Sequence, residues 1–488
     1  MRKKHPFALT AALALFVSPL FASETRVDSA GGLNLVLSDE TQAINPFNLG
    51  NPAGLILLLP QNRFDVAGQW FKQNVAISGR TNTLYGALSE FDSKLSKYHG
   101  FMFFPDKRWA VQFDGDLFHY EDPLQQVNID QSRELFRTAY NFGPFVLGAQ
   151  IRPTQSGVTI KSPTYQGGQL ISGKSDITTW EATGGLLACF PENPGPKQER
   201  FMIGGVYSRN VIPPKEVVNI NFIPSGGPPN VLLTQTITGD AIQTFGPEIY
   251  FESPGGTFQA AAIGRFVNSS GTFQQDSPDA TYIVPSFKLQ EGSETAVVAG
   301  FKAAHPLGKA LALKSGAAFI LDSTDKKTFD PAGALLQDST GVGWQLQTGF
   351  GVEKLEDFTV GLQANLNVVN GTNKDGTGVT TGTTDYLGYR IALGGERWVS
   401  KKWALRVGIV FQNDRVMGDQ DYQTFYYLIS DHQRVINTLI TGGLGFKDSG
   451  FRSDLYLWYG QPTLYDSPSP EAYATQLGAQ LAAAVLFN

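Results

Sequence analysis

The sequence contains almost no cysteine and few charged residues. Cys189 is the one cysteine among 488 residues, and Asp, Glu, Lys and Arg together account for 17% of them. A single cysteine rules out an intrachain disulfide and argues against a thiol-ligated metal cluster. The formal net charge of −6 gives no basic surface of the kind that nucleic acid requires, so no nucleic-acid partner is expected.

Long hydrophobic runs are absent beyond the N-terminus. After residue 30 every apolar run is short, and the one from Leu55 to Leu59 stops at Pro60. A membrane helix requires roughly 20 consecutive apolar residues. The sequence therefore argues against a helical membrane protein.

Residues 1–22 have the pattern of a secretory signal peptide. A basic stretch, Arg2 to Lys4, precedes an apolar stretch at 7–17, and Ala22 precedes the expected cleavage site, with Ser23 as the alternative. No cysteine follows, so a lipoprotein is not expected. We expect three parts in the chain: this signal, a plug segment at 23–61 and a β-barrel at 62–488.

Most of the remaining chain alternates apolar and polar or small residues over stretches long enough for tilted membrane strands, which need about 9–11 residues. In one example the apolar positions are Trp403, Leu405, Val407, Ile409 and Phe411. Successive side chains of a strand point to opposite faces, so one face suits lipid and the other a lumen. A soluble sandwich also alternates, but its strands are usually shorter.

Short turns alternate with long polar loops along the chain. Pro105-Asp106, Gly143-Pro144 and Ser400-Lys401 are short turns, whereas 155–176 and 269–293 are long. In outer-membrane barrels the short connections are periplasmic and the long ones extracellular. The sequence therefore predicts an all-β, transmembrane antiparallel barrel of about 18 strands, and 14 or 16 stay possible because 269–293 is ambiguous.

The last strand alternates apolar residues from Leu477 to Phe487, and Asn488 follows. This pattern resembles the C-terminal signal read by the barrel-assembly machinery, except that the usual signal ends on an aromatic residue. We expect this machinery, outer-membrane lipid and lipopolysaccharide as partners in the outer membrane of a Gram-negative envelope.

The segment before the first strand contains two Asn-Pro steps, Asn45-Pro46 and Asn51-Pro52, and continues with Ala53, Gly54 and Leu55. Proline and glycine favour turns over a long helix here. The apolar run from Leu55 is unsuited to water, so we expect it in the barrel mouth or along the wall. These seven residues are the predicted plug and gating residues; an ordinary turn before a strand is the alternative.

The acidic, Ala-containing stretch at 39–43, followed by Asn51-Pro52-Ala53-Gly54-Leu55 just before the first strand, resembles the FadL-like outer-membrane family. That family includes transporters of long-chain fatty acids and aromatic hydrocarbons, usually with 14 strands. The resemblance implies a hatch that plugs the lumen and a side opening through which apolar substrates leave. A related branch of the family acts in protein secretion.

Five charged residues are expected on the lumen face by alternation: Arg390, Glu396, Arg406, Arg452 and Asp454. They would form either a hydrated wall with cross-strand pairs or a selectivity ladder or hatch anchor. The five histidines show neither a nucleophilic triad nor metal-ligand spacing. We expect no catalytic residue, no metal, no cofactor and no enzyme activity.

Three functions are compatible with these patterns. The first is an outer-membrane channel or transporter for small hydrophobic molecules, gated by the N-terminal segment. The second is an open porin for polar solutes, since an unplugged barrel of 16–18 strands leaves an aqueous channel. The third is a structural or secretion-scaffold barrel. The patterns do not identify the small-molecule substrate.

Overall fold

The computed structural model describes residues 36, 51–57, 62–77, 90–106, 108–122, 127–165, 169–192, 199–222, 231–239, 242–278, 280–354, 357–418, 422–424, 427–429, 433–466 and 472–487. The predicted signal peptide and most of the predicted plug segment lie outside these residues. Within the described ranges, no helix is both long and apolar enough to cross a membrane.

Nearly all described residues belong to strands. The elements are η1 (Pro52–Leu57), β1 (Asn62–Ile77), β2 (Glu90–Asp106), β3 (Trp109–Asp122), β4 (Val127–Asn141), β5 (Phe145–Tyr165), β6 (Gln169–Phe190), β7 (Arg200–Phe222), β8 (Val231–Gly239), β9 (Gln243–Glu252), η2 (Pro254–Gly256), β10 (Phe258–Asp276), η3 (Ala280–Tyr282), β11 (Val284–Leu307), β12 (Leu311–Phe329), β13 (Leu335–Lys354), β14 (Phe358–Asp375), β15 (Thr380–Trp398), β16 (Trp403–Gly418), β17 (Tyr422–Thr424), β18 (Tyr427–Ile429), β19 (Gln433–Asp448), β20 (Phe451–Asp466) and β21 (Ala472–Phe487).

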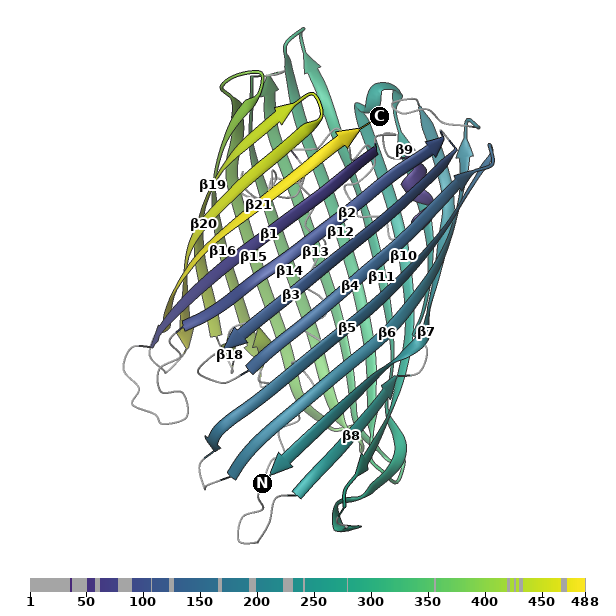
Figure 1. The fold of residues 1–488 in the computed structure, drawn as a ribbon, viewed down its shortest axis with the longest axis vertical. Coiled ribbons are helices and arrows are strands. Elements are labelled where there is room, and N and C mark those ends of the chain that lie inside the picture. Colours follow the sequence, from purple (N-terminus) through teal and green to yellow (C-terminus); the bar gives the residue numbers. More distant parts are fainter. Residues whose placement is uncertain are drawn as a thin grey trace.

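The strands form one closed antiparallel barrel (Figure 1), because β21 pairs with β1 along the whole length of β1. β8 and β9 share one position between β7 and β10: each pairs with both neighbours, β9 nearer the short turns and β8 farther from them. β17 and β18 form a separate small hairpin. The barrel therefore has 18 strand positions, which confirms the predicted number over 14 or 16.

Several strands are much longer than a membrane crossing requires. β5, β6, β7 and β11 contain 21, 22, 23 and 24 residues. The segments expected as long loops at 155–176 and 269–293 are mostly the outer arms of β5 and β6 and of β10 and β11, which stay paired with register shifts after Ser162, Gly271 and Phe273. Polar residues can continue an antiparallel ladder wherever both faces meet water, so these arms lack the apolar alternation that marks the membrane part.

The outer face of the barrel is apolar and the inner face is mixed. On β16, Val407 is 63% exposed, whereas its lumen-facing neighbours Arg406 and Val410 are buried. Large exposed apolar side chains recur in this way on alternate positions of most strands, with Trp109, Tyr140 and Trp403 near the short-turn end. So large an apolar exterior belongs in lipid. The chain is a transmembrane β-barrel, the architecture of outer-membrane proteins.

Replacing a lipid-facing leucine by arginine tests this assignment. Leu481 on β21 is 59% exposed on the apolar face, and Leu336, beside the tip of the β12–β13 hairpin, is 52% exposed. We expect Leu481→Arg to lower the free energy of unfolding by about 2–4 kcal/mol in lipid, because a charge enters hydrocarbon. The control Leu336→Arg should change it little. Equal effects in a denaturant titration of barrels in lipid vesicles would contradict a membrane location for β21.

Candidate functional site

The N-terminal segment is docked inside the barrel. Helix η1 lies against β3, β4, β5 and β6, at the end of the barrel where β21 ends (Figure 1). Asn51 is 1% exposed, and Ala53 and Leu55 are equally buried. The predicted plug residues from Asn51 to Leu55 therefore contact the wall; Asn45 and Pro46 lie outside the described residues.

Two wall glycines make room for this segment. Gly148 on β5 and Gly185 on β6 are cross-strand partners on the lumen face. A Cβ at Gly148 would overlap the backbone of Pro52 and Ala53, and one at Gly185 would overlap the side-chain oxygen of Asn51. Any larger residue at either position is therefore incompatible with the docked segment.

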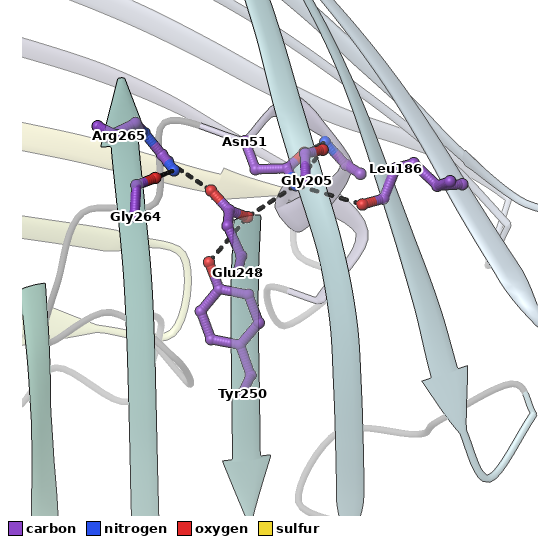
Figure 2. A network of polar contacts seen from close by, with 8 residues as sticks. Asn51, Leu186, Gly205, Glu248, Tyr250, Gly264 and Arg265 are labelled. Atoms are coloured by element: carbon purple, nitrogen blue, oxygen red, sulfur yellow. Dashed lines mark hydrogen bonds and ion pairs between the residues drawn. The ribbon is translucent and has the colours of Figure 1, made fainter. Parts of the chain in front are cut away.

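Asn51 joins the segment to three strands of the wall. Its Nδ2 donates to Glu248 Oε2 at 2.8 Å and to the backbone oxygens of Gly205 at 3.3 Å and Leu186 at 3.5 Å (Figure 2). Its Oδ1 accepts from the Ala53 amide at 3.0 Å, which closes a local turn. The two ends of one amide thus fix both the shape of the Asn-Pro-Ala turn and its place on the wall.

The carboxylate that receives Asn51 is itself fully buried. Glu248 on β9 pairs with Arg265 on β10 and accepts a hydrogen bond from the Tyr250 hydroxyl at 3.0 Å. Arg265 also donates to the Gly264 backbone oxygen at 2.8 Å. A buried charge is tolerated only when it is paired and hydrogen-bonded. Asn51 therefore completes the set of partners that this carboxylate requires (Figure 2).

Apolar contacts surround the polar anchor. Ala53 and Leu55 belong to a buried cluster contributed by β2 to β7, β9 and β10; its other members are Met102, Ala110, Ala139, Val146, Leu187, Cys189, Met202, Tyr250, Ala261 and Ile263. The expectation that the run from Leu55 avoids water by packing on the wall agrees with this position.

A second part of the N-terminal segment lies across the lumen. Val36 is buried against Gly351 of β13 and Gly361 of β14, where a Cβ on either glycine would crowd its methyl groups. Val36 clusters with Ala392, Val410 and Leu439. The segment therefore contacts two separate parts of the wall, each time at a pair of glycines.

Three of the five predicted lumen charges meet in one cluster. Arg406 on β16 donates to Glu396 of β15 at 2.7 Å and pairs with Asp454 of β20. Glu396 also accepts from the Trp398 indole at 3.0 Å. The guanidinium reaches β20 by crossing β19 at Gly445, where a Cβ would overlap it.

The other two predicted charges face the lumen elsewhere. Arg390 lies opposite Gln412, and Arg452 lies opposite Lys447. The docked segment instead meets Glu248, which is paired with Arg265, and sequence reasoning singled out neither residue. Each is a single charge within a short apolar or small-residue stretch, as in Gly246-Pro247-Glu248-Ile249-Tyr250, and that local isolation was the available signal.

Comparison with known proteins finds chains similar to this one among solved structures. No protein-family model and no curated protein matches the sequence. The chain is similar to the toluene transporter TbuX of Ralstonia pickettii (11% identity, TM-score 0.40, covering 97% of this chain and 100% of that one). It is also similar to a Pseudomonas aeruginosa FadL homologue (11%, 0.38, 96% and 98%) and to the ferric citrate transporter FecA (9%, 0.41, 88% and 79%). TM-scores below 0.5 at these identities assign neither family nor substrate.

The glycine pair on β5 and β6 predicts how the docked segment can be released. In a Cys189→Ser background, Leu55→Cys should react slowly with a polar maleimide, because Leu55 is buried. Adding Gly185→Val should accelerate labelling strongly, since the new side chain overlaps Asn51. Gly184→Val is the matched control, because a Cβ at Gly184 meets nothing within 4 Å. Fast labelling before Gly185 is changed, or slow labelling after, would contradict the docking.

Proposed function

We propose that this barrel is an outer-membrane channel or transporter for small hydrophobic molecules, and that its N-terminal segment closes the lumen. The observation that carries the proposal is the docking of that segment on two separate parts of the inner wall, at Asn51–Leu55 and at Val36. An empty barrel of this size would leave an aqueous channel. A segment that lies across the lumen would block most solutes and so suits the selective passage of a few.

The chemistry of the docking surfaces favours apolar cargo. Val36 lies on Ala392, Val410 and Leu439, and Leu55 lies in the larger apolar cluster. When either contact opens, apolar wall is exposed inside a lumen that otherwise holds polar groups. Apolar molecules gain free energy by covering such surface, at about 25 cal/mol per Å². Polar solutes gain no such free energy from covering this apolar surface.

An interruption of the wall supports a lateral exit. Within the described residues, which leave out 240 and 241, the ladder between β7 and the shared β8–β9 position stops after Arg209–Gln243 and resumes at Lys215–Thr238. Pro213 and Pro214 fall in this gap and have no N–H to donate. One backbone hydrogen bond there, Asn210 N to Ile242 O at 3.2 Å, lies within the described residues. Wall segments with few bonds open at the lowest free-energy cost.

An open porin for polar solutes is the second candidate, and one observation favours it. Beyond the docked segment, farther from the short turns, the lumen side of β4, β5 and β6 is polar: Arg137 donates to Gln150 at 2.7 and 2.9 Å, and Arg152 lies 3.7 Å from Glu181. Such a wall suits hydrated solutes. Solute preference separates the two functions.

Uptake by Gram-negative cells that express the full-length chain tests the proposal. We expect faster uptake of a radiolabelled fatty acid or toluene but not of a labelled sugar, because the seated segment blocks water-filled passage. Gly185→Val should admit the sugar as well, and Gly184→Val should behave like the parent chain. Rapid sugar uptake by the parent, without any gain for apolar compounds, would make the protein a porin.

A further inference from the structure

Two arginines face each other on the outside of the barrel. Arg415 on β16 and Arg434 on β19 are direct cross-strand partners, and both side chains are exposed. They share the outward face with Val407 and Ile440, since no register shift interrupts this pair of strands. Like charges directly opposite each other on a sheet are destabilising.

Nothing in the described part of the chain neutralises this pair. Neither arginine forms an ion pair with any acidic side chain there, although Asp385 faces outward on β15 two positions beyond the partner of Arg415. Lysines at the same end of the barrel are compensated: Lys174 pairs with Asp176, and Lys288 with Glu291. An exposed like-charge pair that has no acidic partner among the described residues offers a site for an external anion.

The position of the pair relative to the membrane identifies the source of that anion. The outward face of β16 reads Trp403, Leu405, Val407, Ile409, Phe411, Asn413 and Arg415. Twelve residues separate Trp403 from Arg415, which for tilted strands is an axial rise of about 30 Å. The apolar band of such barrels is about 25 Å tall. Arg415 therefore lies just above the hydrocarbon, at the long-loop end, where the outer-leaflet headgroups are.

Arg434 is held in a defined orientation. Its Nε donates to Asn413 Oδ1 at 2.9 Å, and Asn413 Nδ2 donates to the Tyr389 hydroxyl at 2.6 Å. Asn413 is 6% exposed, so this support is rigid compared with a free surface side chain. With Nε engaged, the two terminal nitrogens of Arg434 remain as a fork, the geometry that binds phosphate in a bidentate manner.

We propose that Arg415 and Arg434 form a binding site for a phosphate group of lipopolysaccharide in the outer leaflet. The phosphate lies between the two guanidinium groups and relieves their repulsion. The acyl chains of the same lipid then run down the apolar face below, past Phe411 and Ile440. The site belongs to the outer surface and is independent of the lumen and its cargo.

Binding of purified lipopolysaccharide to the full-length barrel in detergent, followed by native mass spectrometry, tests the site. We expect Arg415→Gln and Arg434→Gln each to weaken binding about tenfold or more, as the loss of one charge-assisted bond implies. Arg397→Gln is the control, because Arg397 is also exposed on β15 but lies at the short-turn end. Equal binding by all three variants and the parent would overturn the proposal.

Two ligand controls distinguish the source of the phosphate. Enzymatically dephosphorylated lipopolysaccharide should bind the parent no better than it binds the two variants; equally tight binding with and without phosphate would overturn the proposal. Inorganic phosphate in excess should neither bind the parent barrel detectably nor displace the bound lipopolysaccharide. If it did, the site would hold a free anion and the lipid assignment would be wrong.

Thermal unfolding separates this site from a structural role of the arginines. In detergent alone, Arg434→Gln should unfold at the same or a higher temperature than the parent, because repulsion is removed. With lipopolysaccharide added, the parent should gain more from ligand binding and become the more stable protein. A variant that is less stable by the same amount in both conditions would show that the arginines only support the wall.

Discussion

The hydrogen-bonded closure of β21 onto β1 is the constraint on which the rest of this structure depends. Backbone groups exposed to hydrocarbon cost several kcal/mol each, and the ladder from Asn62–Phe487 to Ile77–Ala472 leaves no free edge. A barrel closed at 18 positions is too wide for its own side chains to fill. Its lumen must therefore be open to water or be occupied by another part of the chain, and Val36 and Asn51–Leu55 are the described residues that occupy it.

Glycine solves the packing problem that this occupation creates. A glycine stands opposite at three places where the N-terminal segment or a long side chain meets the inner wall: Gly148 and Gly185 under Asn51–Ala53, Gly351 and Gly361 under Val36, and Gly445 under Arg406. The two docking places differ in chemistry. Asn51 is held by a buried carboxylate and by carbonyls, whereas the contacts of Val36 with the described residues are apolar. The Asn51 side is thus the more specific attachment.

Alternation was sufficient to predict the membrane part of the fold. The outward run from Trp403 to Phe411 and the apolar positions of the last strand lie where they were expected, and β1 begins at Asn62. The outer arms of β5, β6, β10 and β11 were missed because both of their faces are wet. The Glu248–Arg265 pair that receives Asn51 was missed because Glu248 reaches Asn51 only through the register and curvature of the barrel. No local sequence pattern encodes that register or that curvature.

Ion conductance in planar bilayers tests whether the residues before β1 close the lumen. The chain without its predicted signal peptide and a variant that also lacks residues 24–61 would be reconstituted in parallel. We predict a silent or nearly silent parent chain and a large, steady conductance after the deletion, as an unplugged barrel of this width requires. Large and equal conductance in both would show that the docked segment leaves the channel open.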